Sequence, residues 1–357
     1  MALSKIPSAG FQDNVKFRNI IINGGMDLAQ RNTSVSSITT TAYHTVDRWY
    51  NGIATAGTWT ISQSTDVPTG QGFSSSLKMD CTTANASLSS GSLLNIQQRF
   101  EGQNLQYLKK GTSNAESLTL SFWVKSSKTG TYIAELFDND NSRNISKSYT
   151  INSASTWEKK TITFAGDTTG ALDNDNNRSF NLDMWLAAGT DYTSGTLATS
   201  WESITSANRA VGQVNLADST SNEWYITGVQ LEAGTTASDF EFLPFDVQLH
   251  KCKRYYERSY NYGTATGTGT TTGILQMEVI SAGTLLITPI GFEVEKRTTP
   301  SFVTYDGVGN VNKVTTSNGD NKNNNVQNIG AKSVSVGEGD GASMNFFRAH
   351  YTADSEL

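Results

Sequence analysis

Apolar and polar residues alternate with a period of two along most of the first two thirds of the chain. In SLTLSFWVKSS, every second residue from Leu118 to Val124 is apolar, and Trp123 falls on the opposite face. This alternation is typical of strands with one buried face. The same pattern recurs at 57–64, 75–83, 130–140, 156–166, 179–190 and 223–234. Many short strands separated by Gly, Asn and Ser turns predict an all-β protein built as a sandwich or jelly roll.

The last of these segments, EWYITGVQLEAG, changes the parity of its alternation at Gly228. A β-bulge inserts one residue into a strand and shifts parity in this way, so we expect a bulge there. The segment closes a jelly-roll domain that we place at 17–244. The residues before it, 1–16, carry no core pattern and are interpreted as an N-terminal attachment arm that could become ordered against a partner.

A helical period replaces the alternation after Pro244. Phe245, Leu249, Cys252 and Tyr256 recur at helical spacing, which predicts one amphipathic helix over 245–258. Such a helix can brace two β units, the interpretation that we favour, or it can contact another subunit. The rest of the chain, 259–357, reads as a small C-terminal β domain with Gly/Thr-rich and Asn-rich loops.

The composition and net charge of the chain argue against nucleic-acid binding and against membrane insertion. Hydrophobic residues make up 36% of the 357 residues and charged residues 17%, while the seven Trp, 13 Tyr and 15 Phe supply core. A net charge of −6 argues against a nucleic-acid partner. No apolar run approaches the roughly 20 residues that a membrane-spanning helix needs, and the first residues lack the apolar segment of a secretory signal. We therefore expect a chain made in a cytoplasm, with no membrane insertion.

The sequence contains no motif that carries catalysis. The three histidines, His44, His250 and His350, do not have zinc-ligand spacing, and neither H-E-x-x-H, G-x-S-x-G nor a P-loop occurs. We expect no enzyme activity, no cofactor and no resident metal. Cys81 and Cys252 are expected to be buried free thiols.

Two acidic loops are candidate calcium-binding sites. DNDNSRN, from Asp138, and DNDNNRS, from Asp173, place oxygen side chains at the first, third and fifth positions of an EF-like loop. Both lack the glycine at the sixth position and the glutamate at the twelfth. Solvated turns are the favoured interpretation, and an opportunistic calcium ion at either loop stays open.

Aromatic side chains outside the core pattern are the candidates for glycan contact, because sugar rings stack on exposed Trp and Tyr faces. Each such residue alone is more often a packing residue. The candidates are Trp49, Tyr50, Trp123, Tyr192 and Trp201.

Two segments resemble a known group of proteins. The opening FRNIIINGGMDLAQRNTS, followed by YHTVDRW, and the seam WYITGVQLEAGTTASDFEFLPFDVQLHKCKRYY resemble the two ends of a domain in bacteriophage virion appendages of the tail-fibre or head-fibre type. That domain is similar to carbohydrate-binding jelly rolls. The resemblance covers about 15–258 at its ends, with a variable middle.

The resemblance implies a non-enzymatic virion structural protein, assembled in the host cytoplasm, whose partners are other virion proteins. It favours a tail fibre or tail appendage that contributes to attachment to a host-surface glycan, and a homo-oligomer, most simply a trimer. A capsid head fibre or decoration protein is the alternative. A glycan-degrading appendage is less favoured, because it would usually need a repetitive β-helix and no fixed-period repeat is visible.

Overall fold

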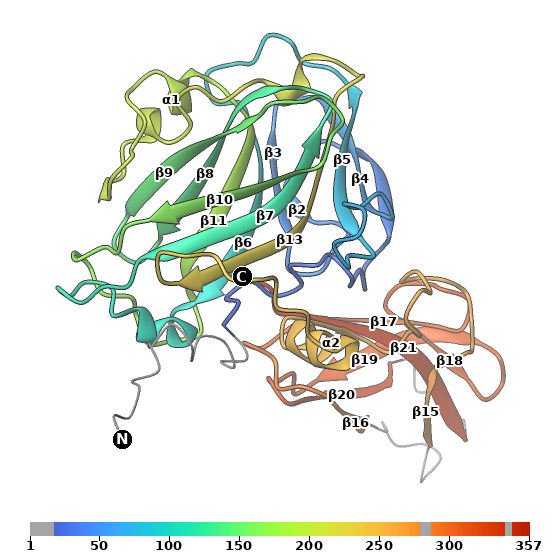
Figure 1. Cartoon of the computed structure of the whole chain (residues 1–357). Coiled ribbons are helices and arrows are strands. Elements are labelled where there is room, and N and C mark those ends of the chain that lie inside the picture. The colour runs from blue at the N-terminus through green and yellow to red at the C-terminus, as the bar shows by residue number, and fades with distance from the viewer. Residues whose placement is uncertain (1–17, 279–286, 340–344) are drawn as a thin grey trace, which may run out of the picture.

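The computed structural model describes residues 18–278, 287–339 and 345–357. They form a large β-sandwich and a smaller β domain beside it, with α2 between them (Figure 1). The predicted arm at 1–16 lies outside the described residues.

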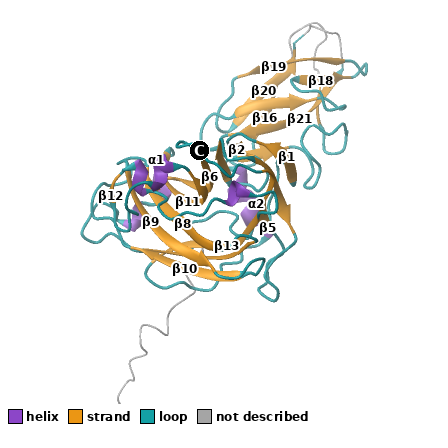
Figure 2. Cartoon of the chain, turned by 90° about the horizontal axis from the view of Figure 1, so that it is seen from above, coloured by secondary structure: helices purple, strands orange, loops and turns teal. Residues whose placement is uncertain are grey.

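The sandwich consists of two antiparallel sheets, seen as two layers in Figure 2. One sheet has six strands and the other has seven. The six-stranded sheet runs in the order β1 (Ser34–Ile38), β4 (Thr58–Ser64), β5 (Ser76–Thr83), β13 (Glu223–Ala233), β7 (Leu118–Ser126) and β10 (Glu158–Phe164). The seven-stranded sheet runs in the order β12 (Glu202–Ser203), β9 (Arg143–Ile151), β8 (Gly130–Asp138), β11 (Arg178–Ala188), β6 (Leu93–Glu101), β3 (Tyr50–Ala54) and β2 (Ala42–Tyr43).

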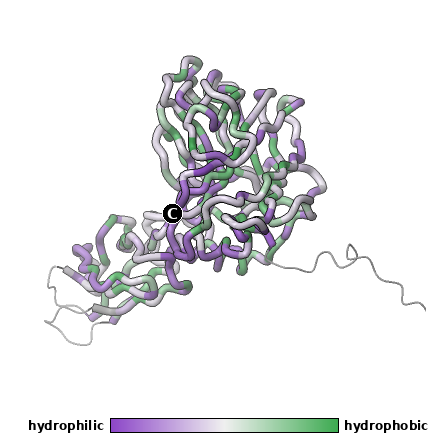
Figure 3. Tube along the Cα trace, turned by 90° about the vertical axis from the view of Figure 1, so that its left-hand side faces the viewer, coloured by the Kyte–Doolittle hydropathy of each residue, from purple (hydrophilic) through white to green (hydrophobic). Residues whose placement is uncertain are grey.

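The chain passes from one sheet to the other on entering β2, β4, β6, β7, β8, β10, β11 and β13, which is the topology of a jelly roll and confirms the predicted fold class. Most apolar residues of the strands face the space between the sheets, whereas Ile133 and Trp185 belong to a separate buried cluster. Hydrophobic and hydrophilic positions are therefore interspersed along the chain trace in Figure 3. Trp59, Phe122, Phe164 and Trp224 are fully buried between the layers. Short helical turns decorate the connections: Gly102–Asn104, Gln106–Leu108, α1 (Thr190–Thr193), Ser206–Asn208 and Leu216–Asp218.

The bulge predicted at Gly228 is present. The pairing of β13 with β7 shifts between Thr227 and Gln230, and Gly228 has a φ of 61°. A Cβ at this position would also lie 2.5 Å from the Phe73 ring. Both the left-handed backbone and the close ring require glycine here.

Residues 18–24, which we call the strap, cross the end of the sandwich and pair with β13. The backbone N–H of Ile20 donates to the Leu231 carbonyl (2.9 Å), and that of Val229 donates to Gly24 (3.0 Å). A Cβ on Gly24 would lie 2.1 Å from the Val229 oxygen, so the approach of the two backbones needs a glycine. The opening motif and the closing strand, far apart in sequence, are therefore one structural unit.

The helix begins at Phe245, as predicted, but α2 ends at Lys253 rather than at 258. Tyr256–Arg258 form a strand instead, β14, which pairs with β21. The predicted apolar stripe is only partly buried, because Cys252 is buried while Phe245 is 49% exposed. Tyr256 pairs through its backbone with β21, and its ring contacts Arg31 of the sandwich, so the chain forms a strand here instead of a further helical turn.

The C-terminal domain is built on a third antiparallel sheet, which begins at β14 rather than at 259. Its order is β14, β21 (Phe346–Asp354), β18 (Lys313–Thr316), β19 (Asn321–Gln327), β20 (Ser333–Glu338) and β16 (Ile287–Gly291). β15 (Leu275–Glu278) and β17 (Ser301–Tyr305) also pair with β21. A separate cluster that includes Val314, Val336 and Phe347 forms its core.

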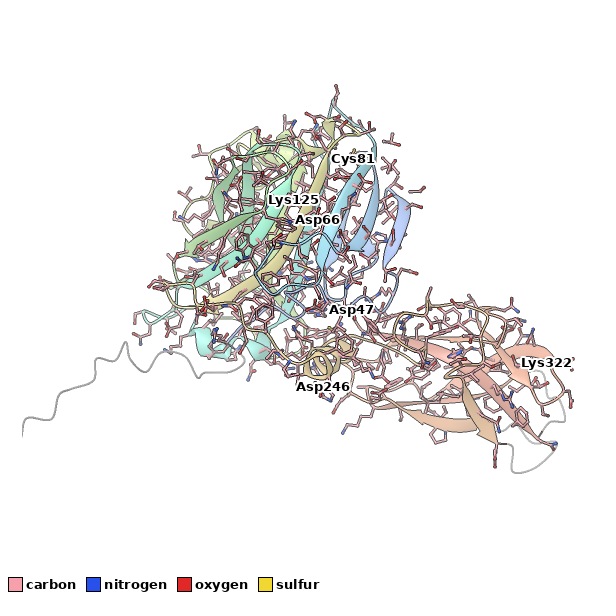
Figure 4. All side chains as sticks on the ribbon, turned by 45° about the vertical axis from the view of Figure 1, so that its right-hand side comes forward. Asp47, Asp66, Cys81, Lys125, Asp246 and Lys322 are labelled. Carbon is pink, nitrogen blue, oxygen red and sulfur yellow. The ribbon has the colours of Figure 1, made fainter. Side chains whose placement is uncertain are left out.

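The two domains meet through a junction of buried charges. The Arg48 guanidinium lies 3.5 Å from the centre of the Tyr255 ring and forms an ion pair with Glu356. Arg31 bonds to Asp354 (2.8 Å) and stacks on Tyr256 (3.8 Å). Figure 4 labels Asp47 at this junction and Asp246 on α2 beside it. These residues come from the opening segment, the seam and the end of β21. The two segments that resemble phage appendages therefore hold the two domains together.

Both cysteines are free and buried, as predicted, and burial raises the pKa of the Cys81 thiol to about 11. None of the helices in the described ranges is long and apolar enough to cross a bilayer.

Candidate functional site

The five predicted aromatic residues do not form one platform: no ring contact within the described structure joins any two of them. Trp49 is 1% exposed and belongs to the core, where its indole N–H donates to the Asn23 carbonyl (3.1 Å). The placement of Trp49 outside the core is therefore wrong, because the turn before β3 directs its ring inward. Its ring offers no face to a sugar.

The other four candidates are half-buried and lie in three places. Trp123 is on the outer face of the six-stranded sheet, the sheet on which Figure 4 labels Lys125 and Asp66. Tyr50 lies on β3 of the seven-stranded sheet, between Gln97 of β6 and Tyr43 of the edge strand β2. Tyr192 packs on Trp185, with ring centres 5.2 Å apart, and Trp201 packs on Phe180 (6.1 Å). Glycan contact by these four residues stays a prediction.

A different set of side chains gathers on the outer face of the seven-stranded sheet. Leu94, Ile96 and Phe100 of β6 face the core, so the alternate residues of β6 face outward. The same holds for β11, whose Leu182 and Met184 face inward. We call the resulting set the polar face: Asn95, Gln97, Arg99, Arg178, Asn181 and Asp183.

The members of the polar face are joined by hydrogen bonds. The amide groups of Asn95 (3.3 Å) and Asn181 donate to the two oxygens of Asp183. Arg178 donates to the Asn181 oxygen (2.9 Å), and Arg99 donates to Gln97 (3.1 Å). Asn95, Asn181 and Asp183 are buried beneath Gln97, Arg99 and Arg178, which are half-buried. The buried layer holds the accessible layer in fixed orientations.

An aromatic ring and a glycine border the polar face on β3. The Arg99 guanidinium lies 3.4 Å from the centre of the Tyr50 ring. A Cβ on Gly52 would lie 2.2 Å from the Asn95 side-chain oxygen, so glycine leaves room for that amide. On the other side, Glu135 accepts from the Trp185 indole (2.9 Å) and from Arg209 (2.8 Å).

Burial perturbs the central carboxyl of this face. Asp183 is fully buried and directly opposite Glu135 in the pairing of β11 with β8. Burial, and next the charge of Glu135, raise the pKa of Asp183 to about 7. A carboxyl group held at such a pKa can both donate and accept hydrogen bonds near neutral pH.

The raised pKa predicts a pH-dependent stability that Asp183→Asn removes. The folded state keeps the Asp183 proton up to about pH 7, whereas the unfolded state loses it near its ordinary pKa of 3.8. The wild-type chain therefore loses stability as pH rises through this window. Relative to wild type, the variant should gain about 2 kcal/mol between about pH 5 and about pH 8. Urea unfolding at a series of pH values measures this, and a difference that does not change with pH would contradict it.

The two acidic loops adjoin each other, and protein donors bond to the carboxylates of Asp138, Asp140 and Asp175. Asp138 forms an ion pair with Lys110 and accepts from the backbone N–H of Asn141 (3.0 Å). Asp140 accepts from the backbone N–H of Asp173 (2.8 Å). Within the described ranges, no group of three or more His, Cys, Asp or Glu side chains is arranged to hold a metal.

The sequence did contain a signal for the polar face. The outward positions of β6 and β11 carry planar amide, carboxylate and guanidinium groups, whereas most outward positions of β10 carry Thr and Lys. The planar polar side chains that alternate with the apolar residues of 93–101 and 178–188 are therefore the sequence signal that could have predicted this face.

The chain is thus an all-β protein whose jelly-roll sandwich bears an ordered polar face and is joined to a second β domain. A scan against protein-family profiles finds no match, and a search of curated proteins finds no related sequence.

Similar solved structures include the enzymatically active domain of tailspike protein 4 of bacteriophage CBA120, at 15% identity and a TM-score of 0.31. The match covers 60% of this chain and only 21% of the tailspike chain. The N-terminal cellulose-binding domain of the Cellulomonas fimi β-1,4-glucanase C matches at 15% identity and a TM-score of 0.27, over 53% of this chain and 90% of that domain. A family 11 carbohydrate-binding module from Clostridium thermocellum matches at 13% identity and a TM-score of 0.27, over 53% and 91%. These scores are low, and the fold assignment rests on the strand order of this chain.

Proposed function

We propose that this protein is a non-enzymatic glycan-binding structural protein of a bacteriophage virion, and that the polar face contacts the glycan. The observation that carries the proposal is the hydrogen-bonded layer of Asn95, Asn181 and Asp183 beneath half-buried Gln97 and Arg178. Sugars present closely spaced hydroxyl groups, and fixed planar amide, carboxylate and guanidinium groups can bond to them in pairs. Preorganisation lowers the entropy cost of binding.

The virion assignment rests on the resemblance of the opening segment and the seam to phage appendages. We propose a tail fibre or tail appendage that contributes to host-surface attachment, with other virion proteins as partners and a trimer as the expected assembly. A head fibre or decoration protein, which binds the capsid lattice, remains the alternative. Saturable binding to empty capsids would favour that alternative over the tail.

A hydrolase is the second class of function to consider, because Asp183 and Glu135 are paired carboxyl groups. Glycosidases use two carboxyl groups on either side of the scissile bond. Here both are fully buried, and Glu135 is engaged by Trp185 and Arg209, which argues for a structural pair. Release of reducing sugar from host polysaccharide by the wild-type protein, lost in Glu135→Gln, would overturn the non-enzymatic proposal.

Binding of the labelled full-length protein to host cells tests the glycan site. The double substitution Gln97→Ala/Arg178→Ala removes accessible donors while leaving the buried layer, and it should weaken binding roughly tenfold. The matched control is Lys159→Ala, an exposed outward position of β10 in the other sheet, which should bind like wild type. Trp123→Ala tests the aromatic prediction on that sheet. Loss of binding in Trp123→Ala alone would move the site to the six-stranded sheet. No sugar-competable binding by the wild type would remove the glycan proposal.

A further inference from the structure

A pocket of about 430 Å³ lies between α2 and the C-terminal sheet, away from the polar face. The seam, α2 and strands of the C-terminal domain contribute to it. The residues that matter for its chemistry are Lys253, Arg258, Asn261, Tyr262 and Glu293.

Arg258 is the unusual member of this lining. Its side chain is only 6% exposed, and within the described residues no carboxylate lies within ion-pair distance of it. It donates instead to two backbone carbonyls of the following loop, Thr264 and Asn261 (3.3 Å). Burial lowers the pKa of this guanidinium. The Asp47 carboxylate acts on the pKa of Arg258 only from beyond ion-pair distance. A buried charge without a directly bonded counter-ion is costly, and arginines are rarely buried unless they are paired.

Arg31, another buried arginine at the junction of the domains, is paired with carboxylates and gives a comparison for Arg258. Arg31 has two acidic partners, Asp354 at 2.8 Å and Glu356 at 3.5 Å. Arg258 lines a pocket and has no such directly bonded partner among the described residues. An anion in the pocket would complete its coordination in the same way.

The remaining lining suits a sugar more than a bare anion. Tyr262 is 47% exposed, and its hydroxyl is anchored by a hydrogen bond to the Asp27 carbonyl (2.8 Å), so its ring is held at the rim. The Asn261 side chain makes no hydrogen bond to any described residue and is available to a hydroxyl group. Rings of this kind receive the apolar face of a pyranose.

The rim carries one further ion pair. Lys253 on α2 bonds to Glu293, whose side chain is 66% exposed. Counting Arg258, Lys253 and Glu293, the lining has one positive charge in excess, on a chain whose net charge is −6. The local charge therefore favours an acidic ligand over a neutral one.

We propose that this pocket binds a carboxylate-bearing saccharide, with the carboxylate at Arg258 and the sugar ring against Tyr262. This site is separate from the polar face and does not depend on the proposed function. It would let one chain bind an acidic glycan unit at the junction of its two domains.

Calorimetric titration of the full-length protein with D-glucuronate tests the site, with D-glucose and inorganic phosphate as the comparison ligands. Glucuronate should bind, and glucose should bind at least roughly tenfold more weakly because it lacks the charge. Phosphate binding as tight as that of glucuronate would show an anion site without a sugar site. Equal affinity for glucose and glucuronate, or no binding of glucuronate, would overturn the proposal.

Two rim substitutions give opposite predicted signs and leave the buried arginine in place. Lys253→Gln should weaken glucuronate binding about threefold, and Glu293→Gln should strengthen it about threefold, as expected for a single charge near the surface. The control pair Lys332–Glu295 lies in the same domain and is exposed, so Lys332→Gln should bind like wild type.

Arg258→Gln should abolish binding, and its thermal unfolding shows whether the fold survives. Changes of the same sign in both rim variants would contradict the proposal. Loss of host-cell binding in Gln97→Ala/Arg178→Ala with intact glucuronate binding would show that this site is separate from the polar face.

Discussion

Arg48→Ala should lower the free energy of unfolding by about 3 kcal/mol, because it breaks a buried ion pair at the junction. Arg48 pairs with Glu356, donates to the Arg99 carbonyl (2.6 Å) and lies 3.5 Å from the centre of the Tyr255 ring. Removal of the guanidinium leaves Glu356, whose side chain is only 5% exposed, with the more distant Arg31 at 3.5 Å. It also leaves a space against the tyrosine ring.

Urea unfolding followed by tryptophan fluorescence measures the loss, and limited proteolysis between the domains reports whether the junction has opened. Glu356→Gln keeps the shape of the partner while removing its charge, so the double variant should lose less than the sum of the single ones. The control Lys332→Ala, in an exposed pair, should change stability by about 0.5 kcal/mol or less. An Arg48→Ala protein as stable as that control would show that the junction does not depend on this pair.

Lys296→Ala should destabilise the C-terminal domain by about 3–5 kcal/mol while leaving the sandwich folded. Lys296 and Glu257 are both fully buried, with 2.6 Å between the ammonium nitrogen and a carboxylate oxygen. The Lys296 ammonium also donates to the Val294 carbonyl (2.9 Å), and the Tyr351 hydroxyl donates to Glu257 (2.7 Å). Alanine would leave the Glu257 charge buried without a cation.

Because the two cores are separate clusters, the sandwich should unfold in its own transition. Differential scanning calorimetry of Lys296→Ala should therefore show an early transition for the small domain and a nearly unchanged one for the sandwich. Lys296→Met restores volume but not charge, and it should recover little of the loss. A single transition shifted as a whole would mean that the domains unfold as one cooperative unit.

The sandwich was predictable because apolar and polar residues alternate with a period of two in a strand that has one buried face. The bulge at Gly228 was predictable for the same reason, since an inserted residue shifts that period. The end of α2 was not, because the helical spacing of Tyr256 is overridden by its pairing with β21, which is distant in sequence.

The functional side chains were harder to predict than the fold. Trp49 follows a polar stretch and gives no local sign that its ring enters the core. The polar face depends on β6 and β11 being neighbours, a pairing that two separate alternating segments do not specify. The outward amides were visible in each strand, but only the sheet order assembles Asn95, Asn181 and Asp183 into one layer.

The strap also determines when the jelly roll can be completed during synthesis, because its partner strand is made much later. The Asn19 side chain donates to the Val229 carbonyl, 210 residues later in the chain. At the usual rate of translation, the opening residues emerge roughly 10–40 s before that partner exists. During this delay the strap has no strand to pair with. Its later pairing closes a loop of 210 residues. Completion of the jelly roll is therefore a late event on the ribosome, and a slow one by the standards of chains with local contacts.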